Sequence, residues 1–299
     1  MNVLISGGSG MLGREISEQL LKLNHNVGWL SRKLEIYHPN VKLFFWKPSS
    51  LWIDQNAINW ADVIINLAGE SIGEIKWTES GKQLILDSRI NAVKTISEGL
   101  KLRRDPIKAF IGVSGVGIYG SSTIPKKESD SFGTDFPASV AKNWEKAYGE
   151  LPESKILHKS IIRLAVVLSA AGGALPKIVE PIRLGVGAPV GTGLQHLNWI
   201  HLEDAAAVFI HAIGLDGVYN ASAPEIVTNE FATLAIAKEI KRKILFPAIP
   251  AFVLQIFLGE RSQLVTTGNI TDSQKLISSG FVFKYPGFKS AISNLLRKD

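Results

Sequence analysis

A glycine-rich turn near the start of the sequence constrains the fold more than any other feature. It has the pattern G-x-x-G-x-x-G at Gly7, Gly10 and Gly13. The turn follows the β-branched run Asn2–Ser6 directly and leads into the amphipathic stretch Leu12–Leu23. Gly7 suits a tight turn, Gly10 lets a pyrophosphate approach the backbone, and Gly13 allows close packing of helix on strand. The N–H groups that open the helix attract phosphate. We predict a dinucleotide site formed by Gly7, Ser9, Gly10, Met11, Leu12 and Gly13; a glycine-rich connector without a ligand is the alternative.

The first half of the chain alternates between short apolar runs and amphipathic stretches. Val63-Ile64-Ile65 is apolar throughout. Such strands are expected when helices cover both faces of a parallel sheet. We predict an α/β fold: a Rossmann-type doubly wound parallel sheet with a smaller C-terminal substrate-binding lobe. The predicted strands are Asn2–Ser6, Asn26–Ser31, Val41–Trp46, Val63–Leu67, Ala109–Ser114, Ile161–Leu168 and Val218–Asn220, and the predicted helices are Leu12–Leu23, Thr78–Leu102, Ala138–Glu150, Leu202–Ile213, Phe231–Lys241 (with Thr228 as N-cap) and Ala291–Arg297.

The chain length favours two lobes, because 299 residues is about twice a typical domain of roughly 150. Residues 1–168, completed by about 198–222, are predicted to form an NADP-binding Rossmann domain. Residues 169–197 and 223–299 are predicted to form a small lobe on the substrate side. The segment 183–195 is rich in glycine, which suits a loop that closes over a ligand; a long connection is the alternative. Gln195, Trp199 and His201 are predicted to line the substrate pocket.

Composition excludes several classes of protein and of site. The chain has no cysteine, which removes disulfides, thiolate metal sites and thiol catalysis. The formal charge of +6 is spread over short basic clusters without interleaved aromatic residues, so we expect no nucleic-acid partner. No apolar run approaches about 18 residues, and Met1–Ser6 shows no leader pattern. We therefore expect a cytoplasmic protein without a membrane partner, as a monomer or a homodimer. His196 and His201 lack a third ligand at metal-site spacing, so no metal is predicted.

The end of the second predicted strand indicates which dinucleotide is bound. An NAD site usually has an acidic residue there, which holds the ribose 2′-hydroxyl. This sequence has Ser31, Arg32 and Lys33 instead. A guanidinium can make two charge-assisted bonds to a 2′-phosphate. Arg32, supported by Ser31, therefore predicts NADP(H) rather than NAD(H); an exposed basic turn is the alternative.

Further motifs carry a family resemblance over nearly the whole chain. The glycine turn, Asn66-Leu67-Ala68-Gly69, Ser114–Gly120 and Asn198–Asp204 resemble the extended short-chain dehydrogenases/reductases. Lys76-Trp77, Ser88-Arg89, Trp144-Glu145, Gly172–Leu175 and Gly280-Phe281 are similar to the atypical subgroup of epimerase family proteins of the SDR39U1 and YfcH type, within the NAD(P)-dependent epimerase/dehydratase superfamily. The resemblance implies an NADP-binding protein whose reaction is undetermined. It adds Asn66, Leu67, Ala68, Gly69 and Arg89 to the predicted cofactor contacts; for Arg89, a surface ion pair is the alternative.

The usual catalytic pattern of this superfamily is missing from the helix where it normally lies. Typical members use a Tyr-x-x-x-Lys pair with a Ser or Thr, in which the tyrosine transfers a proton as hydride moves. Neither Tyr119 nor Tyr148 has a lysine four residues later, and Lys142 has Ala138 at that spacing before it. Ser114, Tyr119 and Lys142 are the remaining candidates for catalysis. Tyr119 could equally fill the base of the crevice by packing.

Two functions of different class fit these observations. The first is an NADP(H)-dependent oxidoreductase or epimerase that acts on an unknown small polar substrate. The second is a catalytically silent NADP(H)-binding sensor or regulatory protein. His201 could replace the missing tyrosine as acid or base; the interpretation we favour is that His201 and Asp204 tie the glycine-rich segment to the first lobe.

Overall fold

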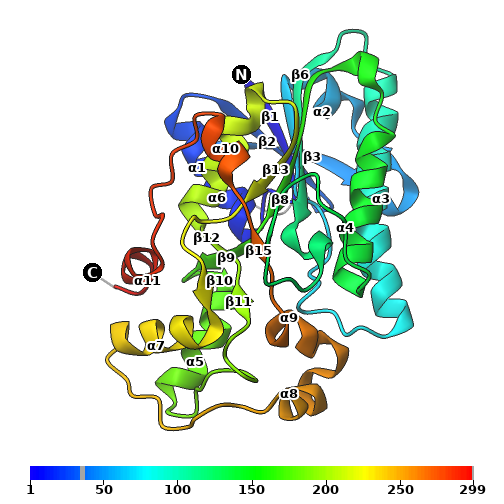
Figure 1. The fold of residues 1–299 in the computed structure, drawn as a ribbon. Coiled ribbons are helices and arrows are strands. Elements are labelled where there is room, and N and C mark those ends of the chain that lie inside the picture. The colour runs from blue at the N-terminus through cyan, green and yellow to red at the C-terminus, as the bar shows by residue number, and fades with distance from the viewer. Residues whose placement is uncertain (34–37, 298–299) are drawn as a thin grey trace.

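An eight-stranded sheet forms the centre of the molecule (Figure 1). The structure is a computed structural model that describes residues 1–33 and 38–297. The strand order is β13-β8-β6-β5-β1-β2-β3-β4, and every neighbouring pair is parallel except β3 and β4. These strands are β1 (Asn2–Ser6), β2 (Asn26–Ser31), β3 (Val41–Lys47), β4 (Trp52–Ile53), β5 (Val63–Asn66), β6 (Ile107–Gly115), β8 (Ile156–Leu164) and β13 (Gly217–Ala221). The strand order reverses beside β1, where open α/β sheets form a ligand-binding crevice.

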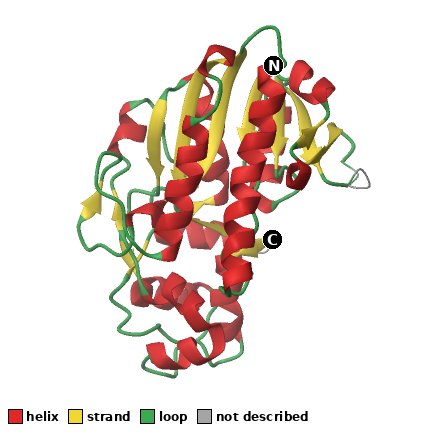
Figure 2. Ribbon diagram, turned by 90° about the vertical axis from the view of Figure 1, so that its right-hand side faces the viewer, coloured by secondary structure: helices red, strands yellow, loops and turns green. Residues whose placement is uncertain are grey.

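Helices cover both faces of this sheet. On one face lie α1 (Met11–Lys22) and α6 (Leu202–His211), and on the other lie α2 (Gln55–Trp60), α3 (Glu79–Lys101) and α4 (Phe136–Gly149). Figure 2 shows two long helices in front of the strands. The middle strands are buried on both sides, and Val63-Ile64-Ile65 has no exposed surface at all. These features confirm the predicted Rossmann-type doubly wound fold.

Side-chain caps explain where the long helices begin. The Thr78 hydroxyl accepts from the Gly81 N–H at 3.2 Å at the start of α3. The Asp135 carboxylate accepts from the Ala138 N–H at 2.9 Å at the start of α4. Such caps satisfy N–H groups that have no partner within the helix.

A second lobe lies beyond the carboxyl ends of the sheet strands (Figure 1). Its core contains Leu168, Leu175, Trp199, Ile236 and Phe288. Small sheets pair β9 (Val166–Ser169) with β10 (Gly172–Gly173) and β12 (Trp199–His201), and β11 (His196–Leu197) with β14 (Val227–Thr228), while β7 (Pro125–Lys126) pairs with β15 (Ile270–Thr271). The later helices are α5 (Ala174–Arg183), α7 (Asn229–Glu239), α8 (Ala251–Leu258), α9 (Gln263–Thr266), α10 (Gln274–Ser278) and α11 (Phe288–Leu296). Short 3-10 helices are η1 (Pro48–Ser50), η2 (Val116–Tyr119), η3 (Glu153–Lys155), η4 (Ala212–Gly214) and η5 (Gly259–Ser262). The predicted domain boundaries stay an interpretation.

The prediction of one strand over Ile161–Leu168 is wrong, because the chain changes sheets at Ala165. Its N–H donates to the Ala221 carbonyl beside the large sheet at 3.0 Å. The next N–H, of Val166, donates to the Asn198 carbonyl at 3.0 Å, and β9 then pairs with β12. A run that is apolar apart from Arg163 therefore contains a change of hydrogen-bonding partner, which hydrophobicity does not reveal.

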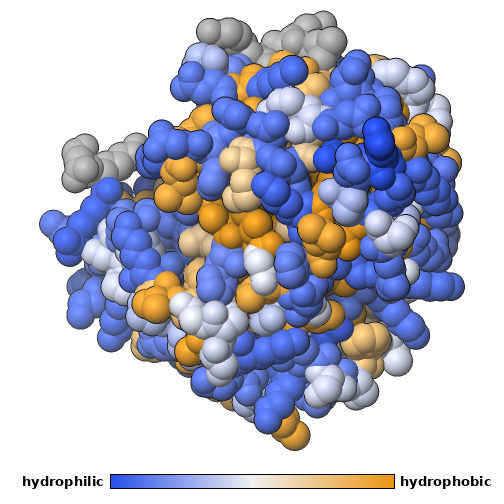
Figure 3. Space-filling model, turned by 90° about the horizontal axis from the view of Figure 1, so that it is seen from above, coloured by the Kyte–Doolittle hydropathy of each residue, from blue (hydrophilic) through white to orange (hydrophobic). Residues whose placement is uncertain are grey.

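The surface over the amino ends of the sheet strands is mainly hydrophilic. Figure 3 looks down on this face and shows apolar patches interrupted by polar side chains. Among residues 1–33 and 38–297, no helix is long and apolar enough to cross a bilayer.

Candidate cofactor groove and active site

The glycine turn has the geometry of an anion-binding cradle. Gly7 has a φ of +71°, a conformation that side chains disfavour. A Cβ at Gly13 would lie 2.5 Å from the Gly7 carbonyl oxygen, so α1 can approach the turn only without one. Gly10 precedes α1 and offers no side-chain cap, and the first turn has no acidic residue. Ser9 and Gly10 are exposed. The opening N–H groups of α1 therefore suit the pyrophosphate of a dinucleotide.

The loop after β5 packs directly against this turn. A Cβ at Gly7 would lie 3.2 Å from the carbonyl carbon of Leu67. Asn66 is fully buried; its Oδ1 accepts from the Ser6 hydroxyl, and its Nδ2 donates to the Tyr148 hydroxyl at 3.0 Å. Asn66 thus positions the loop through its side chain. The residues that are partly or fully exposed beside the turn are Leu67, Ala68 and Gly69.

Arg32 lies at the end of β2 with its side chain 73% exposed. Its Nη1 contacts Glu70 Oε1 at 3.1 Å, so an acidic partner comes from the loop after β5 rather than from β2. Because β1 lies between β5 and β2, this ion pair passes over the end of β1, where the glycine turn begins. The Ser31 hydroxyl is used locally and accepts from the Lys33 N–H at 3.1 Å.

Arg89 is buried on α3 and supports the same loop. Its Nη1 donates to the Ile85 carbonyl at 2.8 Å and to the Glu70 carbonyl at 2.9 Å. Its guanidinium lies 4.8 Å from the centre of the Trp144 ring. Burial lowers the pKa of Arg89 to about 10. A Cβ at Gly69 would lie 3.0 Å from Arg89 Cγ, so glycine makes room for the arginine. The structure thus places Arg89 beneath the predicted cofactor loop, not in a surface ion pair.

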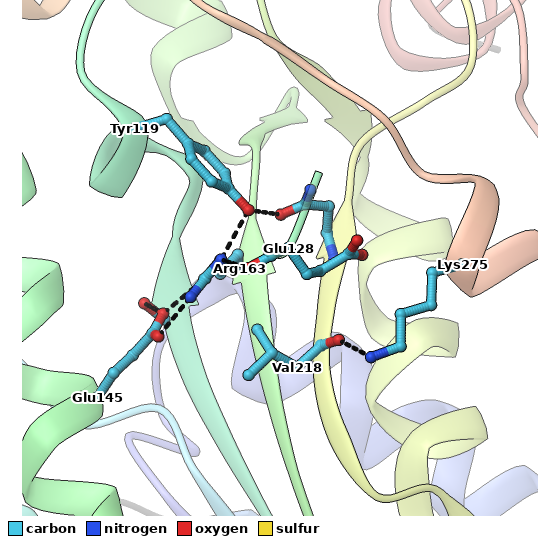
Figure 4. Close-up of polar contacts among 8 residues, drawn as sticks. Tyr119, Glu128, Glu145, Arg163, Val218 and Lys275 are labelled. Atoms are coloured by element: carbon cyan, nitrogen blue, oxygen red, sulfur yellow. Dashed lines mark hydrogen bonds and ion pairs between the residues drawn. The ribbon is translucent and has the colours of Figure 1, made fainter. Parts of the chain in front are cut away.

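A buried polar network occupies the carboxyl ends of β6 and β8 (Figure 4). The Ser114 hydroxyl donates to Glu145 Oε1 at 2.7 Å. Arg163 binds both carboxylate oxygens of Glu145, with Nε at 2.9 Å from Oε1 and Nη2 at 2.8 Å from Oε2. The side chains of Arg163 and Glu145 are 3% and 12% exposed, so this bidentate pair is shielded from solvent.

Tyr119 belongs to the same network and has both sides of its hydroxyl occupied. The hydroxyl accepts from Arg163 Nη1 at 2.7 Å and donates to Asn220 Oδ1 at 2.7 Å. Burial raises the pKa of Tyr119. Lys142 is exposed on α4. The structure therefore brings Ser114 and Tyr119 into one network and leaves Lys142 outside its hydrogen bonds. Their catalytic roles stay predictions.

Sequence reasoning did not assign a role to Glu145 or Arg163. Glu145 belongs to the pair Trp144-Glu145, which contributes to the family resemblance, and it lies three residues after Lys142 on the same helix. Arg163 interrupts an otherwise apolar run in β8. A charged residue inside a buried strand is the signal that could have indicated an ion pair there.

His201 is buried and supports the packing of two segments. Its Nδ1 accepts from the Glu203 N–H at 3.1 Å, which caps α6, and its Nε2 lies 3.1 Å from Asn294 Oδ1. The ring stacks on Tyr285 at 3.9 Å between centroids. The neighbouring Asp204 carboxylate accepts from the Lys284 and Tyr285 N–H groups at 2.8 and 2.9 Å. This geometry gives His201 a structural role, but it joins α6 to Tyr285 and α11 rather than the glycine-rich segment to the first lobe. Over residues 1–33 and 38–297, no cluster of three or more metal-binding side chains is present.

Gln195 and Trp199 likewise make contacts within the second lobe. Gln195 Nε2 donates to the Val190 and Val265 carbonyls, each at 2.9 Å, and so links the glycine-rich segment to α9. Trp199 is 1% exposed, and its Nε1 donates to the Glu225 carbonyl at 3.0 Å. Trp199 therefore lies in the core of the lobe; its place in a substrate pocket stays a prediction.

Comparison with known proteins identifies the family. Residues 3–221 match the model of the NAD dependent epimerase/dehydratase family, and this stretch contains the glycine turn and the buried network. The chain belongs to the NAD dependent epimerase/dehydratase family. Residues 249–295, in the C-terminal part of the chain, match a second family model, the domain of unknown function DUF1731.

Two epimerase family relatives match over nearly their full length. The chain is 35% identical over 302 residues to epimerase family protein YfhF of Bacillus subtilis, covering 99% of this chain and 98% of the relative. It is 28% identical to the human epimerase family protein SDR39U1, with 99% and 100% covered. The crystal structure of the human protein with NADPH superposes with a TM-score of 0.87 at 28% identity and covers 99% of each chain. The chain is thus an SDR39U1/YfhF-type member of the epimerase family.

Proposed function

We propose that this epimerase family member is an NADP(H)-dependent oxidoreductase or epimerase that acts on a small polar molecule. The observation that carries the proposal is the uncapped start of α1 beside the exposed Arg32. The start of α1 suits a pyrophosphate, and Arg32 suits a 2′-phosphate. The human relative, crystallised with NADPH, supports the same choice of dinucleotide.

The residues that would hold NADP(H) come from the carboxyl ends of β1, β2 and β5. The glycine turn would bind the pyrophosphate, and Arg32, next to Ser31, would bind the 2′-phosphate. Leu67, Ala68 and Gly69 would border the dinucleotide, while Asn66 and Arg89 hold that loop from beneath. When bound, NADP(H) supplies hydride chemistry at its nicotinamide.

We propose Ser114 as the catalytic residue. Its hydroxyl proton is directed to Glu145, which leaves the oxygen lone pairs to accept a proton from a substrate hydroxyl. As that proton arrives at Ser114 Oγ, the serine proton can pass to Glu145 Oε1. Glu145 is then a positioning residue and proton acceptor behind the serine. Lys142, on the exposed side of the same helix, is proposed to meet the cofactor ribose.

Equilibrium binding tests the cofactor assignment without a known substrate. The Kd values of NADPH and NADH are measured by titration calorimetry for the native protein and for Arg32→Ala. We expect NADPH to bind more tightly than NADH, and Arg32→Ala to weaken NADPH about tenfold while NADH changes little. Arg104→Ala removes the same charge from an exposed site between α3 and β6 and serves as the control. Equal Kd values for the two cofactors would refute the proposal.

A catalytically silent NADP(H) sensor is the second candidate. It is favoured by the hydroxyl of Tyr119, which two structural hydrogen bonds already occupy. A screen of alcohols, ketones and sugar derivatives, followed by NADPH absorbance, distinguishes the two functions. Turnover that Tyr119→Phe abolishes would make the tyrosine a proton donor. Tight NADPH binding with no turnover of any compound would support the sensor.

A further inference from the structure

A cavity of about 290 Å³ lies between the two lobes, apart from the glycine turn. One wall is formed by Lys76, Trp77 and Thr78, just before α3. The other wall is formed by the end of α8 and the start of η5, from Phe257 to Arg261. This volume equals about ten liquid water molecules and is close to the lower end of small-molecule sites, roughly 300 Å³.

Polar contacts between the lobes hold the two walls of this cavity in place. Arg261 Nη1 donates to the Glu74 carbonyl at 2.9 Å, on the loop that precedes Lys76. Lys82 Nζ contacts Glu260 Oε2 at 2.8 Å. The Trp77 Nε1 donates to the Ile72 carbonyl at 2.9 Å, which fixes the indole. The cavity is therefore formed before any ligand arrives.

Apolar groups provide the largest surfaces of the cavity. Trp77 is 7% exposed, whereas Phe257 on the opposite wall is 78% exposed. Leu258 lies beside Phe257. A large aromatic side chain left in water beside a preformed cavity favours an apolar ligand that would cover it.

The charges around the cavity favour an anion. Lys76, Arg261 and Glu260 line it, and the Glu260 carboxylate is already paired with Lys82, which leaves the two cationic side chains to meet a ligand. In the part of the chain that the structure describes, the buried Nε of Arg261 has no hydrogen-bond partner. Buried N–H groups normally have an acceptor. A carboxylate, sulfonate or phosphate would supply one.

We propose that this cavity binds an organic anion with an aromatic or branched aliphatic body. The body lies between Trp77 and Phe257, and the anionic group meets Lys76 and Arg261. The site is separate from the cofactor groove and does not depend on the proposed reaction. Its walls belong to different lobes, so the ligand contacts both lobes at once.

The probe for this site is 8-anilinonaphthalene-1-sulfonate, which combines an aromatic body with one anionic group. Its fluorescence is titrated on the full chain in the presence of saturating NADP+, which blocks the cofactor groove. We expect one saturable site. Phe257→Ser should weaken binding about tenfold through lost apolar contact, and Lys76→Gln about fivefold through lost charge.

A matched control comes from the same helix. Phe252 is 64% exposed on α8 but does not line the cavity, so Phe252→Ser should leave the Kd of the probe unchanged. Equal losses for Phe252→Ser and Phe257→Ser would show general binding to the apolar surface of α8 and would overturn the proposal.

A neutral probe of the same shape tests the anionic part. N-phenyl-1-naphthylamine lacks the sulfonate, so it should bind more weakly and should not respond to Lys76→Gln. If Lys76→Gln affects both probes alike, or neither, the assigned anion contact is wrong. The Kd of NADPH should be the same in all these variants, which separates a failure here from a failure of the proposed function.

Discussion

The hydroxyl of Ser114 donates to the carboxylate of Glu145 at 2.7 Å and so joins the end of β6 to α4. The same carboxylate pairs with Arg163 on the adjacent strand β8. A shielded ion pair thus fixes the orientation of the serine that we propose for catalysis. The helix α4 lacks the tyrosine and lysine pair that is usual in this superfamily, and it instead directs Glu145 at the end of β6.

Replacing Glu145 tests how far the network depends on its charge. In Glu145→Gln the buried Arg163 loses its anionic partner, so we expect the free energy of unfolding to fall by about 3 kcal/mol. Urea denaturation followed by circular dichroism measures this change. Lys101→Gln breaks the exposed pair Lys101–Glu98 and should cost no more than about 0.5 kcal/mol. Similar losses in the two variants would contradict the importance given to burial.

Replacing Glu70 tests the ion pair that passes over the glycine turn. In Glu70→Gln the carboxylate no longer competes for Arg32, so NADPH should bind about threefold more tightly while NADH changes little. Titration calorimetry measures both Kd values. Glu74→Gln, on the same loop and 70% exposed at its side chain, is the control. Weaker NADPH binding in Glu70→Gln would instead mean that Glu70 holds Arg32 in place for the phosphate.

Replacing Gly13 tests the packing of α1 on the turn. The added Cβ of Gly13→Ala would lie 2.5 Å from the Gly7 carbonyl oxygen and 2.6 Å from Gly8 Cα. We expect a loss of about 2 kcal/mol in stability and at least tenfold weaker NADPH binding. Gly149→Ala is the matched control, since nothing lies within 4 Å of its added Cβ. In the helix α4 that alanine should stabilise by about 0.5–1 kcal/mol.

The buried His201 should make stability depend on pH. Burial lowers the pKa of His201 from its ordinary value of 6.5, so the unfolded chain takes up this proton first as the pH falls. His201 therefore favours the folded state fully above pH 6.5, and this contribution is lost as the pH falls below 6.5. Burial raises the pKa of neighbouring Asp204 above its ordinary value of 3.8, so the folded chain holds this proton to a higher pH than the unfolded chain does. Above pH 3.8 the contribution of Asp204 to stability therefore falls as the pH rises, which is opposite to the effect of His201.

His201→Asn isolates the histidine contribution, because asparagine is also a good N-cap for α6. Urea midpoints of the native protein and of this variant are compared between pH 7.5 and 5. The native protein should lose more stability over this range than the variant. Parallel curves would show that His201 takes up its proton equally in the folded and unfolded states.

The parts of the site that follow from sequence are those formed by neighbouring residues. The glycine turn needs only seven consecutive residues between a strand and a helix, and its geometry agrees with the role predicted for each glycine. The Arg163–Glu145 pair, in contrast, forms only when β8 lies beside β6 and α4 packs over them. Hydrophobic pattern gives neither the strand order nor the direction of a buried side chain.

Arg89 illustrates the same difference. Its place on a helix was predictable, but its contact with the Glu70 carbonyl depends on the path of the loop after β5 and on the space left by Gly69. The break at Ala165 has a similar origin, since its N–H and that of Val166 donate to carbonyls in different parts of the fold.

The passage of the chain at Ala165 also determines how the two lobes can be separated. The chain enters the second lobe at β9, leaves it through β12 to form α6, returns to the large sheet as β13, and enters the second lobe again at β14. No single cut therefore releases either lobe intact. The second lobe cannot be exchanged between relatives as a terminal module, and a truncation before Val227 would remove part of its core together with the wall of the inter-lobe cavity.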